Sequence, residues 1–188
     1  MLKHLTNEGR FVEITGFKNM MVEKPDQLLK AIRNNGQADV AVQFFNANLV
    51  ATWEHLYFAV LDALMAFRTK RNISKSLAVE VMLYASAQRQ IKKAIELIGV
   101  GSGCSDLAVL VAGDSRAAVE STVASISKHF RKEPDERVLE LSLAKAQAIR
   151  GAFGITENEL TVVAKQNDVG RALVDLVIER MALLSTRL

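Results

Sequence analysis

The stretch Asp106-Leu107-Ala108-Val109-Leu110-Val111-Ala112 decides the fold, because every residue after its first is apolar. A glycine-rich loop at 99–103 precedes it, and Asp114 follows it closely. A short apolar run bounded by loops is typical of a strand that is buried on both faces of a sheet. We therefore predict a buried strand over Asp106–Ala112.

Two other segments are rich in β-branched and aromatic residues and are predicted as strands, Phe11–Phe17 and Val40–Phe45. Gly16 is expected to weaken or bend the first of them. We expect an α+β fold, with a small, mainly antiparallel sheet flanked by many helices and a helical C-terminal region, as a single domain over residues 1–188. Helices are predicted over Pro25–Arg33 (ended by Asn34–Gly36), Trp53–Phe67, Gln88–Ile98, Val138–Arg150, Thr156–Lys165 and Val169–Leu184, and two more end near Ala85 and His129.

Helix starts are marked by side chains that can accept from free backbone N–H groups. Thr52 precedes the predicted helix at 53–67. Ser74 or Ser76 is expected to begin the helix that ends near Ala85. Thr156 and Glu159 have the spacing of a capping box.

Composition places the chain among ordinary globular proteins, since 49% of its 188 residues are apolar and 24% are charged. A single cysteine, Cys104, excludes an intrachain disulfide and a cysteine-based metal cluster. This usage favours a reducing, cytoplasmic setting. With no apolar run of about 18 residues, no transmembrane span is expected.

Positive charge is concentrated between Arg68 and Lys93. This segment holds seven basic residues and one acidic residue, Glu80, so its local charge is +6 in a chain whose net charge is +3. Two interpretations stay open: a solvated loop and helix face, or a phosphate-binding patch for nucleic acid.

Motifs for catalysis, metals or cofactors are not found. The histidines at 4, 55 and 129 lack metal-ligand spacing, and His55 is interpreted as structural because its helix is apolar on nearly all sides. No base is identified for Cys104. The glycines at 99–103 follow a helix and precede a strand, which is the reverse of a phosphate loop, so Gly99 is interpreted as a helix cap. We expect no enzymatic activity and no cofactor.

The predicted last helix carries more apolar surface than one core needs. Four charged residues, Asp168, Arg171, Asp175 and Glu179, occupy a sector about 80° wide. Only Arg180 and Gly170 interrupt the apolar residues around the rest of the helix. Either its own domain encloses the remaining surface or another chain covers it.

Residues 68–100 carry three distinctive groups. Arg71-Asn72-Ile73 opens the segment, Glu80 with Leu83-Tyr84-Ala85-Ser86 forms its middle, and Gln88-Arg89-Gln90-Ile91 with Ala94, Ile95 and Gly99 closes it. In this order they resemble the family of kinase-binding subunits of the KEOPS complex, in its archaeal form. The similarity extends to Glu54-His55-Leu56 and to Gly154-Ile155-Thr156. Ala87 stands where many members have glycine.

The resemblance implies a non-catalytic, regulatory subunit. KEOPS places a threonylcarbamoyl group on the adenosine beside the tRNA anticodon, and another subunit carries the transfer chemistry. Family members bind the complex's small atypical kinase, an ATPase, through their late helices. Archaeal members also capture tRNA, including its single-stranded 3′ CCA end. The expected kinase interface comprises Leu173, Val177, Ile178, Met181 and Leu184.

For tRNA, the resemblance and the charge together suggest phosphate contacts by basic residues and base or sugar contacts by polar ones. Glu80 and Tyr84 share a helix face, and an internal hydrogen bond involving them stays an alternative. Other hypotheses are a pure interaction scaffold without tRNA contact, and an enzyme for a small anion with His55, Glu80 and Arg89 in one pocket. The candidate tRNA residues are Arg68, Lys70, Arg71, Asn72, Lys75, Tyr84, Ser86, Gln88, Arg89, Lys92 and Lys93.

Overall fold

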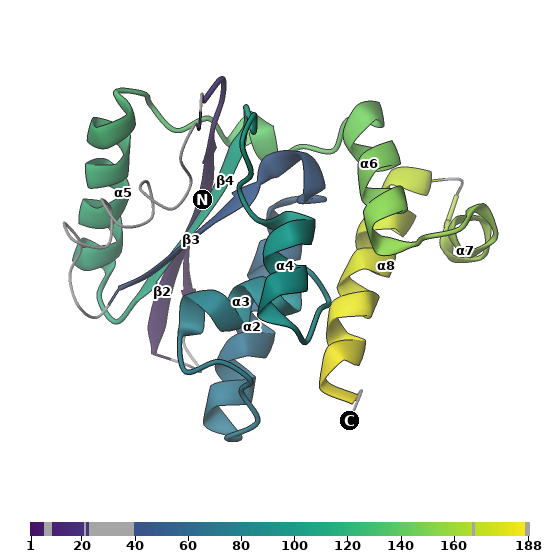
Figure 1. Cartoon of the computed structure of the whole chain (residues 1–188), viewed down its shortest axis with the longest axis horizontal. Coiled ribbons are helices and arrows are strands. Elements are labelled where there is room, and N and C mark those ends of the chain that lie inside the picture. Colours follow the sequence, from purple (N-terminus) through teal and green to yellow (C-terminus); the bar gives the residue numbers. More distant parts are fainter. Residues whose placement is uncertain (6–8, 21, 23–39, 167, 187–188) are drawn as a thin grey trace. The chain divides into compact units, whose positions relative to one another are not determined.

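The computed structural model describes residues 1–5, 9–20, 22, 40–166 and 168–186. Backbone contacts divide the chain into two compact units (Figure 1). The sheet unit comprises Met1–Ala47 and Val100–Val138, and the helical unit comprises Asn48–Gly99 and Leu139–Leu188. That the whole chain is one domain stays a prediction. The helix expected at Pro25–Arg33, with its end at Asn34–Gly36, lies outside the described residues.

The described strands form a four-stranded antiparallel sheet in the order β1-β2-β4-β3. This confirms the predicted α+β class and the three predicted strands. β1 was not predicted, because its four residues are too few to show an alternating pattern. The strands are β1 (Leu2–Leu5), β2 (Arg10–Phe17), β3 (Ala41–Asn46) and β4 (Leu107–Gly113).

β4 lies between two neighbours and is buried along its whole length, as its apolar sequence predicts. Beside it, Gly16 of β2 leaves no room for a side chain. A Cβ there would lie 1.8 Å from Cγ2 of Val138 and 2.8 Å from the Leu107 carbonyl oxygen. Gly16 is therefore needed for a close approach of two segments, in addition to its expected weakening of the strand.

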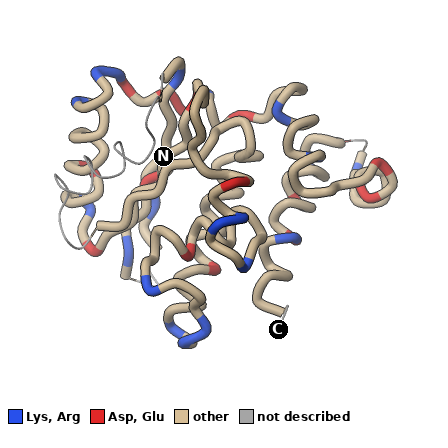
Figure 2. The backbone as a smooth tube through the Cα atoms, viewed as in Figure 1, with Lys and Arg blue, Asp and Glu red and all other residues tan. Residues whose placement is uncertain are grey.

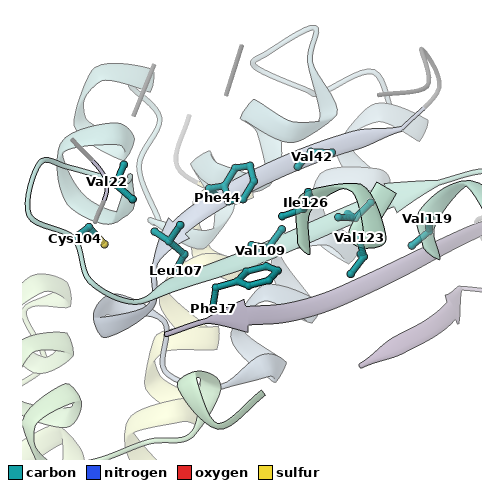
Figure 3. Packing of buried hydrophobic residues seen from close by; sticks show 11 residues of the cluster. Phe17, Val22, Val42, Phe44, Cys104, Leu107, Val109, Val119, Val123 and Ile126 are labelled. Carbon is teal, nitrogen blue, oxygen red and sulfur yellow. The ribbon is translucent and has the colours of Figure 1, made fainter. Parts of the chain in front are cut away.

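One face of the sheet packs against α5 (Arg116–Phe130) (Figure 3). Phe17 and Phe130 meet edge to face with ring centroids 4.9 Å apart. Ser115 starts α5, where its hydroxyl accepts from the Ala118 N–H at 3.2 Å. The helix is thus positioned by a cap at its start and an aromatic contact at its end.

The helical unit is built around α2 and α8, which pack against one another. Two predicted starts were wrong: α4 begins at Ile91 instead of Gln88, and α6 begins at Leu143 because residues 136–139 form a 3-10 turn (η3, Glu136–Leu139). The capping box of Thr156 and Glu159 is confirmed. The elements are α2 (Trp53–Arg68), α3 (Leu77–Ala85), α4 (Ile91–Ile98), α6 (Leu143–Phe153), α7 (Glu157–Val163), α8 (Val169–Ala182) and η4 (Leu183–Thr186).

Thr52 precedes α2 as expected, but its hydroxyl makes no capping bond and, among the described residues, is buried without a hydrogen-bond partner. In the part of the chain that the structure describes, no helix is long and apolar enough to cross a membrane.

Candidate functional site

The connector between α2 and α3, residues 69–76, begins with a tight turn. The N–H of Lys70 donates to the Phe67 carbonyl at 3.1 Å, and the N–H of Arg71 donates to the Ala66 carbonyl at 2.8 Å. This bond pair is a Schellman motif, with Lys70 in the left-handed region at φ 57°. The turn fixes the direction in which the basic connector leaves α2.

The carboxylate of Glu80 holds the next part of the connector. Its residue is fully buried, and its oxygens accept from the Ile73 N–H at 3.0 and 3.1 Å and from the Ser74 N–H at 2.7 Å. Asn72 Nδ2 donates to the Ser74 carbonyl at 3.0 Å. Glu80 therefore has a structural role, with backbone N–H groups of the connector as its partners.

The end of α3 repeats the same motif. The Ala87 N–H donates to the Tyr84 carbonyl at 2.8 Å, and the Gln88 N–H donates to the Leu83 carbonyl at 3.0 Å. Ala87 has a φ of 51°, in the region that glycine occupies without strain. Alanine in place of glycine at position 87 therefore keeps the turn but strains its backbone. This turn places Arg89 ahead of α4, so Arg89 does not share a helix face with Lys92 and Lys93, as one helix from Gln88 would have required.

Replacing Ala87 with glycine is expected to raise the free energy of unfolding by about 1 kcal/mol, because the left-handed conformation costs a residue with a Cβ about that much. Urea unfolding measures the change. Ala124→Gly is the control, since Ala124 is exposed within α5 and should lose about 1 kcal/mol. A loss of stability at both positions would contradict the assignment of strain to Ala87.

A pocket of about 700 Å³ opens between the end of α2, the connector and the C-terminal segment of the helical unit. Asp62 and Thr69 come from the α2 side, Arg71 from the connector and Tyr84 from α3. Arg89 reaches the opposite wall, where its Nη1 donates to the Leu184 carbonyl at 3.4 Å. The size is typical of a small-ligand site. Neither His55 nor Glu80 is among the lining residues, so the three residues of the enzyme hypothesis do not meet there.

Two groups in this pocket have shifted proton affinities. Burial raises the pKa of the Asp62 carboxyl to about 6. Burial also raises the pKa of the Tyr84 hydroxyl, with smaller effects in the same direction from the charges of Glu80 and Asp62 and an opposing effect from Arg89. At neutral pH the pocket thus presents a phenol, a largely ionised carboxylate and two guanidinium groups.

The seven basic residues of the segment are all exposed, and all belong to the helical unit (Figure 2). Arg71 and Arg89 line the pocket, whereas Lys92 pairs with Glu96 at 3.9 Å on α4. Among the polar candidates, Tyr84 lines the pocket, Asn72 and Gln88 are half-buried, and the Ser86 hydroxyl is buried against the Leu83 carbonyl. Sequence reasoning did not identify Asp62 as a site residue, because one acid flanked by apolar residues gives no pattern.

The comparison with known families covers both units. The model of the family described as Kinase binding protein CGI-121 matches residues 17–185. This chain belongs to the CGI-121 family. The Regulatory protein Cgi121 of Methanocaldococcus jannaschii is 37% identical to it over 113 residues, which cover 60% of this chain and 70% of that protein. The family resemblance drawn from residues 68–100 is thereby confirmed.

In this CGI-121 chain six of the fourteen α8 residues, all of them apolar, are buried. Leu173 and Val177 belong to the core of the helical unit. Met181 is also buried, and Leu184 is buried in the pocket wall. Ile178 packs against the same core but stays half-buried. The helical unit itself thus buries much of the apolar surface that the sequence of α8 carries. The assignment of these five residues to a kinase interface stays a prediction.

Exposed apolar side chains are found elsewhere on the late helices of this family member. Leu143 of α6 is 88% exposed and Val162 of α7 is 84% exposed. Val169 and Leu183, near the two ends of α8, are also exposed. Sequence reasoning did not single them out, because isolated apolar residues on short helices resemble ordinary core positions.

His55 joins the start of α2 to the end of α3. Its Nδ1 accepts from the Ala51 N–H at 3.2 Å, so the proton lies on Nε2, which donates to the Ala85 carbonyl at 2.7 Å. Burial lowers the pKa of His55 to about 4, with Lys145 adding to this effect and the Ala85 bond opposing it. The structural interpretation of His55 is confirmed.

Acidification from pH 7 to 5 is expected to remove about 2 kcal/mol of stability through His55, because the neutral ring is favoured in the folded state. The neutral His55 ring contributes fully to the free energy of unfolding above the unfolded pKa of 6.5, and this contribution falls as the pH approaches 4. Asp62 acts in the opposite direction, since its pKa is raised on folding. Urea unfolding of the native chain and His55→Gln at both pH values isolates the histidine effect. An equal pH dependence in both proteins would contradict it.

Cys104 is buried, and burial raises the pKa of its thiol. Its Sγ donates to the Asp106 carbonyl at 3.4 Å. Among the described residues, no group of three His, Cys, Asp or Glu side chains is placed to hold a metal ion.

Proposed function

We propose that this chain is the non-catalytic KEOPS subunit that binds the complex's small atypical kinase and recruits tRNA in the cytoplasm. In this role it presents tRNA for threonylcarbamoylation of the adenosine next to the anticodon. Membership of the CGI-121 family supports the kinase partner. The name of the relative, a regulatory protein, supports a role without catalysis.

The pocket lined by Arg71, Tyr84 and Arg89 is the observation that carries the tRNA proposal. Its two guanidinium groups can form paired hydrogen bonds with phosphate oxygens. An RNA single strand is recognised by stacking and by hydrogen bonds to exposed base edges. Tyr84 lines the pocket, where this 6% exposed residue offers a small contact surface. The remaining exposed basic residues extend the positive surface beyond the pocket, as a duplex stem would need.

Binding of the purified chain to intact tRNA and to the same tRNA without its 3′ CCA, at two salt concentrations, tests this proposal. We expect binding that weakens with salt and falls at least about tenfold without CCA. Equal binding to both RNAs, or none, would reject the pocket as an RNA site and favour an interaction scaffold without tRNA contact.

Ile178→Arg is expected to reduce binding to the kinase at least about tenfold, because a charge would replace the one half-buried apolar side chain among the five predicted interface residues. A pull-down titration with the kinase measures it. Glu179→Arg is the control on the exposed face of α8. Thermal unfolding must show that both variants fold. Normal kinase binding by a folded Ile178→Arg protein would show that Ile178 does not lie in the kinase interface.

A further inference from the structure

The otherwise cationic pocket contains one carboxylate, that of Asp62. It lines the same pocket as Arg71 and Arg89. Within the described ranges, the Asp62 carboxylate has no hydrogen-bond or ion-pair partner. Other acids of this unit do have such partners: Glu54 pairs with Arg171 at 2.8 Å, and Glu80 accepts from the connector. No contact among the described residues therefore explains why this position carries an acid.

Keeping a carboxylate at this position does not stabilise the folded chain. Burial disfavours its charged form, which is why its pKa rises to about 6. A polar group that is partly removed from water without an internal partner is a candidate for ligand contact, especially when it lines a pocket.

We infer that Asp62 accepts hydrogen bonds from the free ribose hydroxyls of the terminal nucleotide and excludes a nucleotide that carries a 3′ phosphate. This inference rests on the proposed binding of an RNA 3′ end in the pocket. It adds the feature by which the pocket distinguishes an end from the interior of a strand.

The chemistry of an RNA end fits this arrangement. An ionised carboxylate accepts hydrogen bonds and donates none, whereas the 2′ and 3′ hydroxyls of the last nucleotide can donate them. Each interior nucleotide carries a phosphate on its 3′ oxygen instead, and a second negative charge beside Asp62 is repelled. Arg71 and Arg89 attract the phosphates on the 5′ side of the same nucleotide. The combination admits a chain end and rejects a continuous strand.

Three RNA hairpins with the same stem test the inference: one ending in CCA with a free 3′ hydroxyl, one ending in CCA with a 3′ phosphate, and one without CCA. We expect the native chain to bind the phosphate-ended hairpin at least about tenfold more weakly than the hydroxyl-ended one. Asp62→Asn should bring the two affinities to within about twofold, because asparagine removes the negative charge at nearly the same size. Asp175→Asn, on the exposed face of α8, should behave like the native chain.

The possible outcomes separate the inference from the function on which it rests. CCA-dependent binding with equal affinity for both ends would overturn the role of Asp62 and leave tRNA recruitment standing. Discrimination that persists in Asp62→Asn would also overturn it. Binding that does not depend on CCA would overturn the proposed function and the inference together. Asp62→Asn is expected to fold, since it removes a charge that burial disfavours, and thermal unfolding checks this.

Discussion

Glu80→Ala is expected to lower the free energy of unfolding by about 3 kcal/mol and to weaken tRNA binding. The loss of stability follows because the N–H groups of Ile73 and Ser74 lose a charged, buried acceptor. RNA affinity falls because the connector that carries Arg71 is no longer fixed. Urea unfolding and RNA titration measure the two effects.

The direction of the RNA effect makes this test informative. Removing an acid from a basic surface would strengthen RNA binding if only charge mattered. Glu96→Gln is the control for that case, because Glu96 is exposed beside Lys92 on α4; its affinity for RNA should stay equal or rise. Glu80→Gln keeps one acceptor oxygen, so its stability and its RNA affinity should lie between those of the native chain and those of Glu80→Ala. Tighter RNA binding by Glu80→Ala at unchanged stability would show that Glu80 does not hold the connector.

The double variant Arg71→Ala, Arg89→Ala is expected to lose about 100-fold in affinity for tRNA that ends in CCA. Both guanidinium groups line the pocket, and hydrogen bonds from a cation to phosphate are among the strongest polar contacts. The variant should bind tRNA with and without CCA about equally, since contacts outside the pocket remain. Equilibrium binding to both RNAs measures the loss.

Lys92→Ala, Lys93→Ala is the matched control, because it removes the same charge from α4 outside the pocket. It should weaken binding of both RNAs alike and reduce the slope of log affinity against log salt by about 0.9 for each lost duplex phosphate contact. If this control abolished CCA dependence and the arginine pair did not, the binding site would lie on α4 instead of in the pocket.

Much of the fold was predictable where one local signal dominates. The apolar run at Asp106–Ala112 matches a strand, β4, that is buried along its whole length, and Thr156 with Glu159 forms the capping box that its spacing indicates. The wrong helix starts arose where local turns compete with helical periodicity. At Gln88 the turn after α3 continues past the last helical residue, so α4 begins later.

The candidate site was predictable only in part. Charge concentration identified Arg71 and Arg89, and the family resemblance identified Tyr84. The sequence did not indicate Asp62, because its neighbours in sequence are apolar and its place in the pocket lining depends on how α2 and α3 pack. The burial of Leu173 and Val177 was not predictable for a related reason, since periodicity shows how much of α8 is apolar and does not show which side the unit itself covers.

The order of the strands has a consequence for synthesis on the ribosome. β4 lies between β2 and β3, yet it follows both in the sequence. While the chain is being translated, β2 and β3 each leave a strand edge bare until β4 emerges from the exit tunnel. The helical unit likewise waits for residues 139–188. Neither unit is complete until most of the chain has been made, so the nascent protein is expected to need protection from aggregation throughout its translation.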